Sequence, residues 1–245
     1  METTGVTPLR IFPTPESLGN DLAARVVERV RNGRKPFLLG CPTGRTPTPM
    51  YQALTGSDLP DVILVMMDEY LVPGPEGLTW ASQREPWSCH GFVKHNVAFE
   101  VRDIWFPDPA DPPAYDEKIA DAGGIDLFIL ASGASDGHVA FNSTGSPRDS
   151  RTRVVPLSDQ TRRDNLATFP SFGAIENVPK HGVTVGIETI ASARESIMVV
   201  WGASKRLTLQ RMLAAERYEP AWPATVIHEC PVREIVADSA AAPFT

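Results

Sequence analysis

The chain has 245 residues, of which 42% are hydrophobic and 22% are charged, and it carries a formal net charge of −7. This length and composition are ordinary for one large α/β unit and ample for a sizeable core. The acidic balance argues against a nucleic-acid partner, because binding to a phosphate backbone requires a basic surface. It leaves room for a small phosphorylated ligand, since a local cationic pocket can oppose the global sign.

The N-terminus and the cysteines place further limits on the class of protein. Residues 1–17, METTGVTPLRIFPTPES, lack the basic and apolar regions of a secretory signal. No apolar run approaches the roughly 18 residues of a membrane helix. The three cysteines, Cys41, Cys89 and Cys230, form no CxxC pair, which predicts neither a disulfide framework nor a zinc site. We therefore expect a cytoplasmic protein that does not bind membranes.

Apolar runs of strand length alternate with helical patterns along the whole chain. In chain order, the sequence predicts a helix over 15–33, strands over 36–40 and 61–67, a helix over 84–97, a strand over 103–107, a helix over 112–123, strands over 125–131 and 195–202, a helix over 204–216 and a strand over 232–238. Continuous apolar strands separated by helices are typical of a mostly parallel sheet covered on both faces. No shift in composition divides the chain, so we expect one domain over residues 1–245.

Polar segments follow four of these strands, at the point where each strand ends. They read, in turn, CPTGRTP, MDEY, SGASDGH and ASKR. Because ligands of parallel α/β sheets bind outside the carboxyl ends of the strands, we expect the four segments to meet in one site. Each segment alone is also compatible with an ordinary turn or helix cap, so the prediction depends on their convergence.

Two of the four segments have the character of an anion site. Thr43, Gly44, Arg45 and Thr46 precede a predicted helix, whose free backbone N–H groups suit phosphate together with the hydroxyls and the guanidinium. Lys205, in the first turn of another predicted helix, opposes the helix dipole unless an anion is bound beside it. The alternatives are a plain strand-to-helix turn and a solvated lysine.

The other two segments carry groups that can move protons. Asp68 directly follows a buried strand, where partial desolvation can tune it as a base near neutral pH, whereas Glu69 is expected to point away and be structural. His138 can accept and donate protons near neutral pH, and Asp136 could orient it or touch the substrate. Gly137 permits a tight turn between them. A turn cap at Asp68 and an Asx turn beside a surface histidine are the alternatives.

The order of these segments resembles a known superfamily, that of glucosamine-6-phosphate deaminase/isomerase and 6-phosphogluconolactonase. The resemblance covers nearly the whole chain and is carried by FLLGCPTGRTP, VMMDEY, DLFILASGASDGHVAFN, SRTRVVPLSDQTR, VPKHGVTVGIETI and VVWGASK. SRTR followed by TVGIETI favours the deaminase branch over the lactonase branch. The resemblance implies a Rossmann-like three-layer α/β sandwich with a mostly parallel central sheet, and no metal or organic cofactor.

The resemblance also implies roles for the matching residues. Asp68 would move a proton between C1 and C2 of an open-chain amino- or hydroxy-sugar 6-phosphate. His138 would catalyse ring opening, with Asp136 as its partner in the active site. The implied phosphate cradle consists of Thr43, Gly44, Arg45, Thr46 and Lys205.

The chain departs from the family pattern at positions that bear on activity. FNST stands where the deaminases read FNEP, so Ser143 replaces an acid that assists His138 in ring opening. Ala167 stands at about the aligned place of a phosphate-binding arginine, and TGRTP stands where the deaminases read TGGTP. We hypothesise that Arg45 takes over from the missing arginine. Arg153 matches a position tied to activator binding in some deaminases, but we expect no such regulation here.

Three functions stay open at this point, each with a small phosphorylated sugar as the ligand. The first is an aldose–ketose isomerase or deaminase, in which Asp68 and His138 are both essential. The second is a lactonase, in which His138 activates water against a phosphorylated sugar lactone and no acid is needed at position 143. The third is a non-catalytic sugar-phosphate sensor, which has no need of a positioned base such as Asp68. Homo-oligomerisation is left open.

Overall fold

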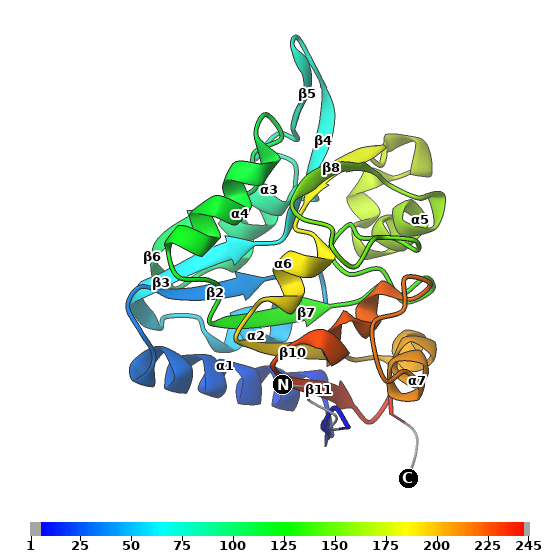
Figure 1. Ribbon diagram of the computed structural model, residues 1–245. Helices are drawn as coiled ribbons and strands as arrows, with labels where there is room; N and C mark the ends of the chain where they lie inside the picture. Colours follow the sequence, from blue (N-terminus) through cyan, green and yellow to red (C-terminus); the bar gives the residue numbers. More distant parts are fainter. Residues whose placement is uncertain (1–5, 243–245) are drawn as a thin grey trace.

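Two sheets organise residues 6–242, which are the residues that the computed structural model describes (Figure 1). Within them, seven strands form one parallel sheet in the order β1-β11-β10-β7-β2-β3-β6. Its strands are β1 (Leu9–Phe12), β2 (Phe37–Cys41), β3 (Asp58–Met66), β6 (Glu100–Trp105), β7 (Leu127–Ala131), β10 (Glu195–Val200) and β11 (Val232–Asp238). The second, antiparallel sheet has the order β5-β4-β9-β8, with β4 (Asp68–Gly74), β5 (Gly77–Trp80), β8 (Arg153–Pro156) and β9 (His181–Thr184).

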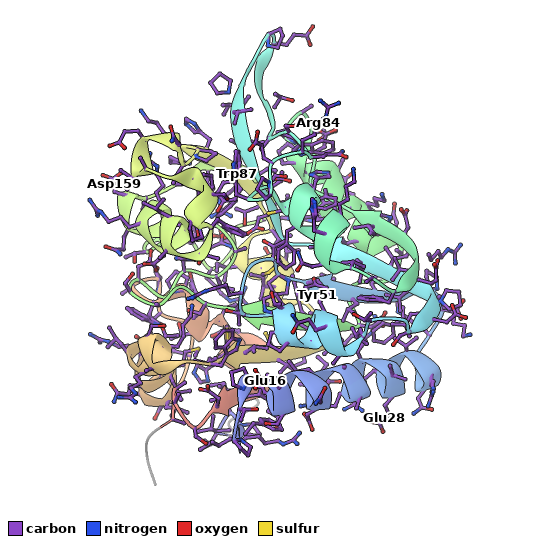
Figure 2. The ribbon with its side chains drawn as sticks, turned by 180° about the vertical axis from the view of Figure 1, so that it is seen from behind. Glu16, Glu28, Tyr51, Arg84, Trp87 and Asp159 are labelled. Carbon is purple, nitrogen blue, oxygen red and sulfur yellow. The ribbon has the colours of Figure 1, made fainter. Side chains whose placement is uncertain are left out.

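Helices cover both faces of the parallel sheet and complete the predicted three-layer α/β sandwich (Figure 1). One face packs against α1 (Pro15–Asn32), α2 (Thr48–Ala53) and α3 (Cys89–Asn96). The other packs against α4 (Pro112–Asp121), α6 (Ile187–Ala191), α7 (Arg206–Ala214) and the 3₁₀ helix η4 (Pro223–Glu229). The spacing of apolar residues on α1 explains its placement, because Leu18, Leu22 and Val26 share one face and are buried. Glu16 and Glu28 lie on its outer face (Figure 2).

The small sheet has its own core and adjoins the carboxyl edge of the parallel sheet. Only Met67 separates β3 from β4, so the chain passes directly from one sheet into the other. Tyr70 packs against Phe141 and Phe172, with ring centroids 4.9 and 5.8 Å apart. The segment over α5 (Asp159–Thr168), η1 (Pro170–Phe172) and η2 (Ile175–Asn177) contributes further apolar side chains to this core.

All ten elements predicted from the sequence are present, and several of their bounds differ; β3 and β6, for example, each begin three residues earlier than predicted. The predicted helix over 84–97 begins only at Cys89, because Ser88 caps it by accepting a hydrogen bond from the Gly91 N–H at 2.9 Å. The predicted helix over 204–216 is divided into η3 (Ala203–Lys205) and α7. Among the described residues, no helix is long and apolar enough to cross a membrane.

Strands β2 and β7 approach each other closely at Gly40, which lies opposite Phe128. A Cβ added at this position would lie 2.2 Å from the buried Phe128 ring. We expect Gly40→Ala to lower the free energy of unfolding by about 1–3 kcal/mol, because the overpacked core must shift. Urea denaturation measures this change, and an unaltered transition midpoint would contradict the close approach.

Candidate active site

A pocket of about 400 Å³ brings the four predicted segments together at the carboxyl edge of the parallel sheet. This volume is within the usual range for sites that bind small molecules. The predicted site residues that line it are Thr43, Gly44, Arg45 and Thr46 after β2, Asp68 after β3, His138 after β7 and Lys205 after β10. The geometry therefore favours one site over four unrelated turns.

Asp68 lies at the corner between β3 and β4, with only 8% of its surface exposed. The Sγ of Cys89, at the start of α3, donates a hydrogen bond to Oδ1 of Asp68 at 3.4 Å. The same sulfur lies 3.5 Å from the Thr43 hydroxyl. Burial raises the pKa of Asp68 to about 7, and the hydrogen bond from Cys89 offsets this only in part. A carboxylate with a pKa near neutral pH is suited to act as a general base.

Glu69 lies outside the pocket and holds the surrounding backbone in place. Its fully buried carboxylate accepts hydrogen bonds from the backbone N–H groups of Tyr70, Cys89 and His90 at 2.7, 3.0 and 2.8 Å. It also lies 2.6 Å from Nδ1 of His90. These contacts fix the start of α3 and so place the Cys89 thiol beside Asp68. The structural role predicted for Glu69 is confirmed.

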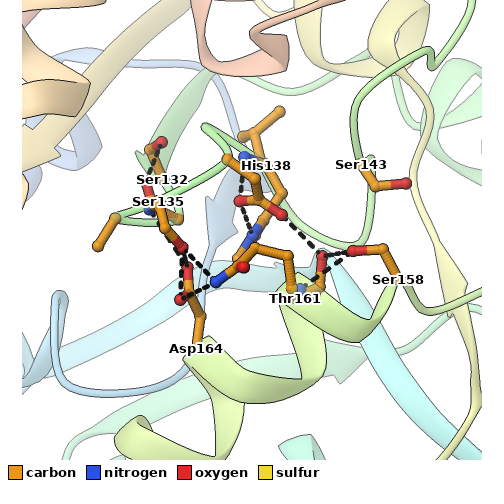
Figure 3. A network of polar contacts seen from close by, with 12 residues as sticks. Ser132, Ser135, His138, Ser143, Ser158, Thr161 and Asp164 are labelled. Carbon is orange, nitrogen blue, oxygen red and sulfur yellow. Dashed lines mark hydrogen bonds and ion pairs between the residues drawn. The ribbon is translucent and has the colours of Figure 1, made fainter.

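His138 lies on a tight turn after β7, next to Asp136. Its Nδ1 is 2.6 Å from Oδ1 of Asp136, whose Oδ2 accepts a hydrogen bond from Thr161 at 3.1 Å (Figure 3). Gly137 has φ +65°, and a Cβ there would lie 2.4 Å from the Trp222 ring, so the turn requires glycine. Burial opposes ionisation of Asp136, but His138 and Thr161 outweigh it and lower the pKa of Asp136 to about 2.

The contact with Asp136 determines which ring nitrogen of His138 is free to contact a ligand. Because Nδ1 of His138 is engaged by Asp136, Nε2 is the nitrogen left for a ligand. Asp136 does not line the pocket, whereas His138 does. The arrangement therefore favours an orienting role for Asp136 over direct contact with a substrate.

Arg45 and Lys205 form the cationic part of the pocket. Burial lowers the pKa of Lys205 to about 8; Asp164 opposes this shift and Arg45 adds to it. The ammonium of Lys205 donates a hydrogen bond to the carbonyl of Ser132, whereas the Arg45 guanidinium makes no ion pair within residues 6–242. Two cations that repel each other beside a pocket are well suited to share an anion. The sequence predicts Lys205 within the first turn of a helix over 204–216. In the structure it is instead the last residue of η3 and precedes the first turn of α7.

Helix α5 contributes groups that the sequence analysis did not single out. Thr161, Asp164 and Asn165 are spaced by three and four residues, which places them on one face of the helix. Asp164 and Asn165 line the pocket, and so does Ala167. Asn165 is buried, and its side chain interacts with the hydroxyl of Tyr70, which also lines the pocket. The polar i, i+3, i+4 spacing in an otherwise weakly amphipathic helix was the available signal.

Ser143 lies outside the pocket lining, and its hydroxyl makes no hydrogen bond to any described residue (Figure 3). The adjacent Asn142 is fully buried and donates to the carbonyl of Val185 at 2.8 Å. Arg153 donates to Oδ1 of Asn142 at 2.9 Å, so its guanidinium helps to hold this segment. The segment that follows His138 therefore presents no carboxylate to the pocket.

One group of side chains in the described region has the spacing of a metal site. Single donor atoms of Asp136, His138 and Asp164 lie within 4.8 Å of one another. Two of the three residues already pair with each other, and Lys205 interacts electrostatically with both carboxylates. The nearby positive charge makes the cluster a poor site for a divalent cation.

Comparison with known proteins shows the family to which the chain belongs. Residues 13–236 match the family described as glucosamine-6-phosphate isomerases/6-phosphogluconolactonase. The chain belongs to this family. Among curated relatives, it is 32% identical to a glucosamine-6-phosphate deaminase of Shouchella clausii over 240 residues, which cover 93% of each chain. It is 35% identical to the deaminase of Rhodococcus opacus over 246 residues, 95% of this chain and 90% of that protein.

Solved structures agree with the fold of the family. A monomeric glucosamine-6-phosphate deaminase superposes with a TM-score of 0.82 at 26% identity, covering 97% of this chain and 100% of the other. A 6-phosphogluconolactonase from Shewanella baltica superposes with a TM-score of 0.68 at 18% identity, covering 96% and 99%. The second likeness concerns the fold alone.

The burial of Asp68 predicts a stability that depends on pH. Its folded pKa, about 7, lies above the ordinary value of 3.8, so the folded state holds a proton that the unfolded state releases between these pH values. The contribution of Asp68 to the free energy of unfolding is therefore at its maximum below about pH 4 and decreases as the pH rises toward 7. We expect Asp68→Asn to be more stable than the wild type at pH 8, by up to about 4 kcal/mol.

Urea unfolding at pH 4 and pH 8 measures this difference, which should shrink toward zero at the lower pH. Asp121→Asn, at an exposed site on α4, serves as the control and should change little at either pH. Equal stability of wild type and Asp68→Asn at pH 8 would show that Asp68 is not strained by its burial.

Proposed function

We propose that this protein is a deaminase and isomerase of glucosamine 6-phosphate or a closely related amino-sugar 6-phosphate. The observation that carries the proposal is the meeting of the buried base Asp68, the imidazole of His138 and the cations Arg45 and Lys205 in one pocket. The names of the relatives, which are 32% and 35% identical over most of their length, support this choice of substrate.

Ring opening is the first step of the proposed reaction, and His138 performs it. The sugar binds with its phosphate between Arg45 and Lys205 and its anomeric carbon beside His138. Nε2 of His138 takes the proton of the O1 hydroxyl, the C1–O5 bond breaks, and its electron pair stays on O5. The proton then passes to O5, and the open-chain aldehyde remains. Asp136 holds the ring and stabilises the imidazolium, as an ionised carboxylate does for a histidine base.

Asp68 performs the second part of the reaction. Its carboxylate takes the proton from C2 of the aldehyde while the electron pair moves through C1 to O1. It then returns the proton to C1 while a proton of the C2 amine passes to O1, which leaves a C1 hydroxyl and an imine at C2. Water adds to C2 and ammonia leaves, so that the products are a ketose 6-phosphate and ammonia. With a hydroxyl in place of the amine, the same transfer is an aldose–ketose isomerisation.

Hydrolysis of a phosphorylated sugar lactone is the second candidate function. Ser143 favours it, because attack of water activated by His138 needs no carboxylate from this position. The cationic part of the pocket would bind the phosphate of the lactone in the same way. Asp68 has no evident task in this reaction, which is why deamination ranks first.

Ammonia release from glucosamine 6-phosphate tests the proposal directly. We expect the wild type to release ammonia and Asp68→Asn to do so at least about 100-fold more slowly, because the proton acceptor is removed. Production of the ketose 6-phosphate is measured in the same samples. A wild-type protein that releases no ammonia but hydrolyses 6-phosphogluconolactone would replace deamination with the second candidate.

Replacement of Arg45 tests the phosphate part of the pocket. We expect Arg45→Ala to raise KM for glucosamine 6-phosphate about tenfold or more with little change in kcat, because a charge-assisted contact is lost in substrate and transition state alike. Steady-state kinetics measure both constants, with Arg31→Ala, at an exposed site on α1, as the control. An unchanged KM would show that Arg45 does not hold the phosphate.

A further inference from the structure

Asp164 is an acidic residue inside a pocket that otherwise suits an anion. It projects from α5 toward the loop that carries Ser135 and His138 (Figure 3). A carboxylate oxygen of Asp164 lies within 4.8 Å of a ring nitrogen of His138 and of a carboxylate oxygen of Asp136. Asp164 lines the same pocket as His138, whereas Asp136 does not. The imidazole therefore has one carboxylate behind it and a second one on the side of the pocket.

The carboxylate of Asp164 is held in a fixed position. The Ser135 hydroxyl lies 2.6 and 2.8 Å from its two oxygens, and Nε2 of Gln160 donates to one of them at 3.3 Å. The side chain is half-buried and makes no ion pair with any described residue, although its charge acts on Lys205. The Ser135 N–H also donates to the carboxylate of Asp164, at 3.4 Å. The single oxygen of an asparagine could still accept from the Ser135 hydroxyl and from Gln160, so most of these contacts do not require a charge. They account for the position of the side chain but not for its charge.

A negative charge at this place works against phosphate binding. The negative charge of Asp164 offsets part of the positive charge that Arg45 and Lys205 bring to the pocket. It therefore weakens the attraction of the pocket for an anion. The same negative charge is favourable in the step in which His138 is protonated and carries a positive charge. A carboxylate nearby in a partly water-excluded site stabilises that imidazolium without further reorganisation.

We propose that Asp164 is a positioning residue that acts through His138, stabilising the imidazolium formed while the sugar ring opens. The proposal rests on the function proposed above, since it concerns the proton that His138 takes from the O1 hydroxyl and passes to O5. Asp136 fixes the ring at Nδ1, and Asp164 offsets the charge from the side of the pocket. The carboxylate that Ser143 does not supply thus comes from α5, at a different place in the fold.

Asp164→Asn tests this inference, because asparagine keeps the size of the side chain and an oxygen acceptor for Ser135. We expect kcat for glucosamine 6-phosphate to fall about 10- to 100-fold, while KM stays the same or decreases. Calorimetric binding of inorganic phosphate at pH 6.5, where Lys205 remains protonated, should be unchanged or tighter. Asp164→Glu should recover part of the lost kcat, since it restores the charge. Asp159→Asn, at an exposed acidic position on the same helix, is the matched control and should behave as the wild type.

Four results would overturn the inference. They are an unchanged kcat in Asp164→Asn, a joint loss of phosphate binding and thermal stability in that variant, an equal loss of kcat in Asp164→Glu, and inactivation of the wild type by a chelator, which would make the cluster a metal site. Failure of the proposed function is recognised separately, from a wild type that releases no ammonia. The same variants are then compared on 6-phosphogluconolactone, and a wild type inert on both substrates overturns both proposals.

Discussion

The burial of Asp68 is the constraint on which the rest of the site depends. The Asp68 side chain is only 8% exposed. It is held there because the backbone passes from the parallel sheet into the antiparallel sheet at this residue. The strand that precedes Asp68 belongs to the parallel sheet, and the strand that begins with it belongs to the antiparallel one. The side chain is thus fixed in a desolvated corner, where burial raises its pKa to about 7.

Both sheets contribute residues to the lining of the pocket. The parallel sheet supplies the cationic loop after β2, the turn with His138 and the lysine after β10, as expected for the carboxyl edge of such a sheet. The small sheet and α5 close the pocket from the other side, and α5 contributes Asp164 and Asn165. The cationic side chains and His138 therefore lie at one edge of the parallel sheet, with Asp68 at the corner where the chain leaves it, and the small sheet and α5 add groups from the opposite side.

The sequence predicted the parallel sheet well, because its strands are continuous apolar runs that end in polar segments. It did not reveal β1 at the edge of that sheet, nor β4, β5, β8 and β9, which are all four to seven residues long and lack a continuous apolar run. For the same reason, the site could be predicted where it follows strands, at Asp68 and His138, and not where it lies on α5. The distance between Asp164 and His138 depends on how α5 packs over the small sheet, and no local pattern in the sequence encodes that packing.

The contacts of Glu69 have a consequence for how this family member can vary. A single carboxylate joins the start of α3 to the first residues of β4, across the whole intervening segment of residues 71–88. The hairpin of β4 and β5 extends away from the body of the protein beyond this junction (Figure 1). Its turn, residues 75–76, lies outside the contacts of Glu69, whereas Trp80 at its base packs against His90, with ring centroids 4.9 Å apart. The tip of this arm can thus change in length or acquire contacts of its own without touching the residues that hold Asp68 in place, whereas its base cannot.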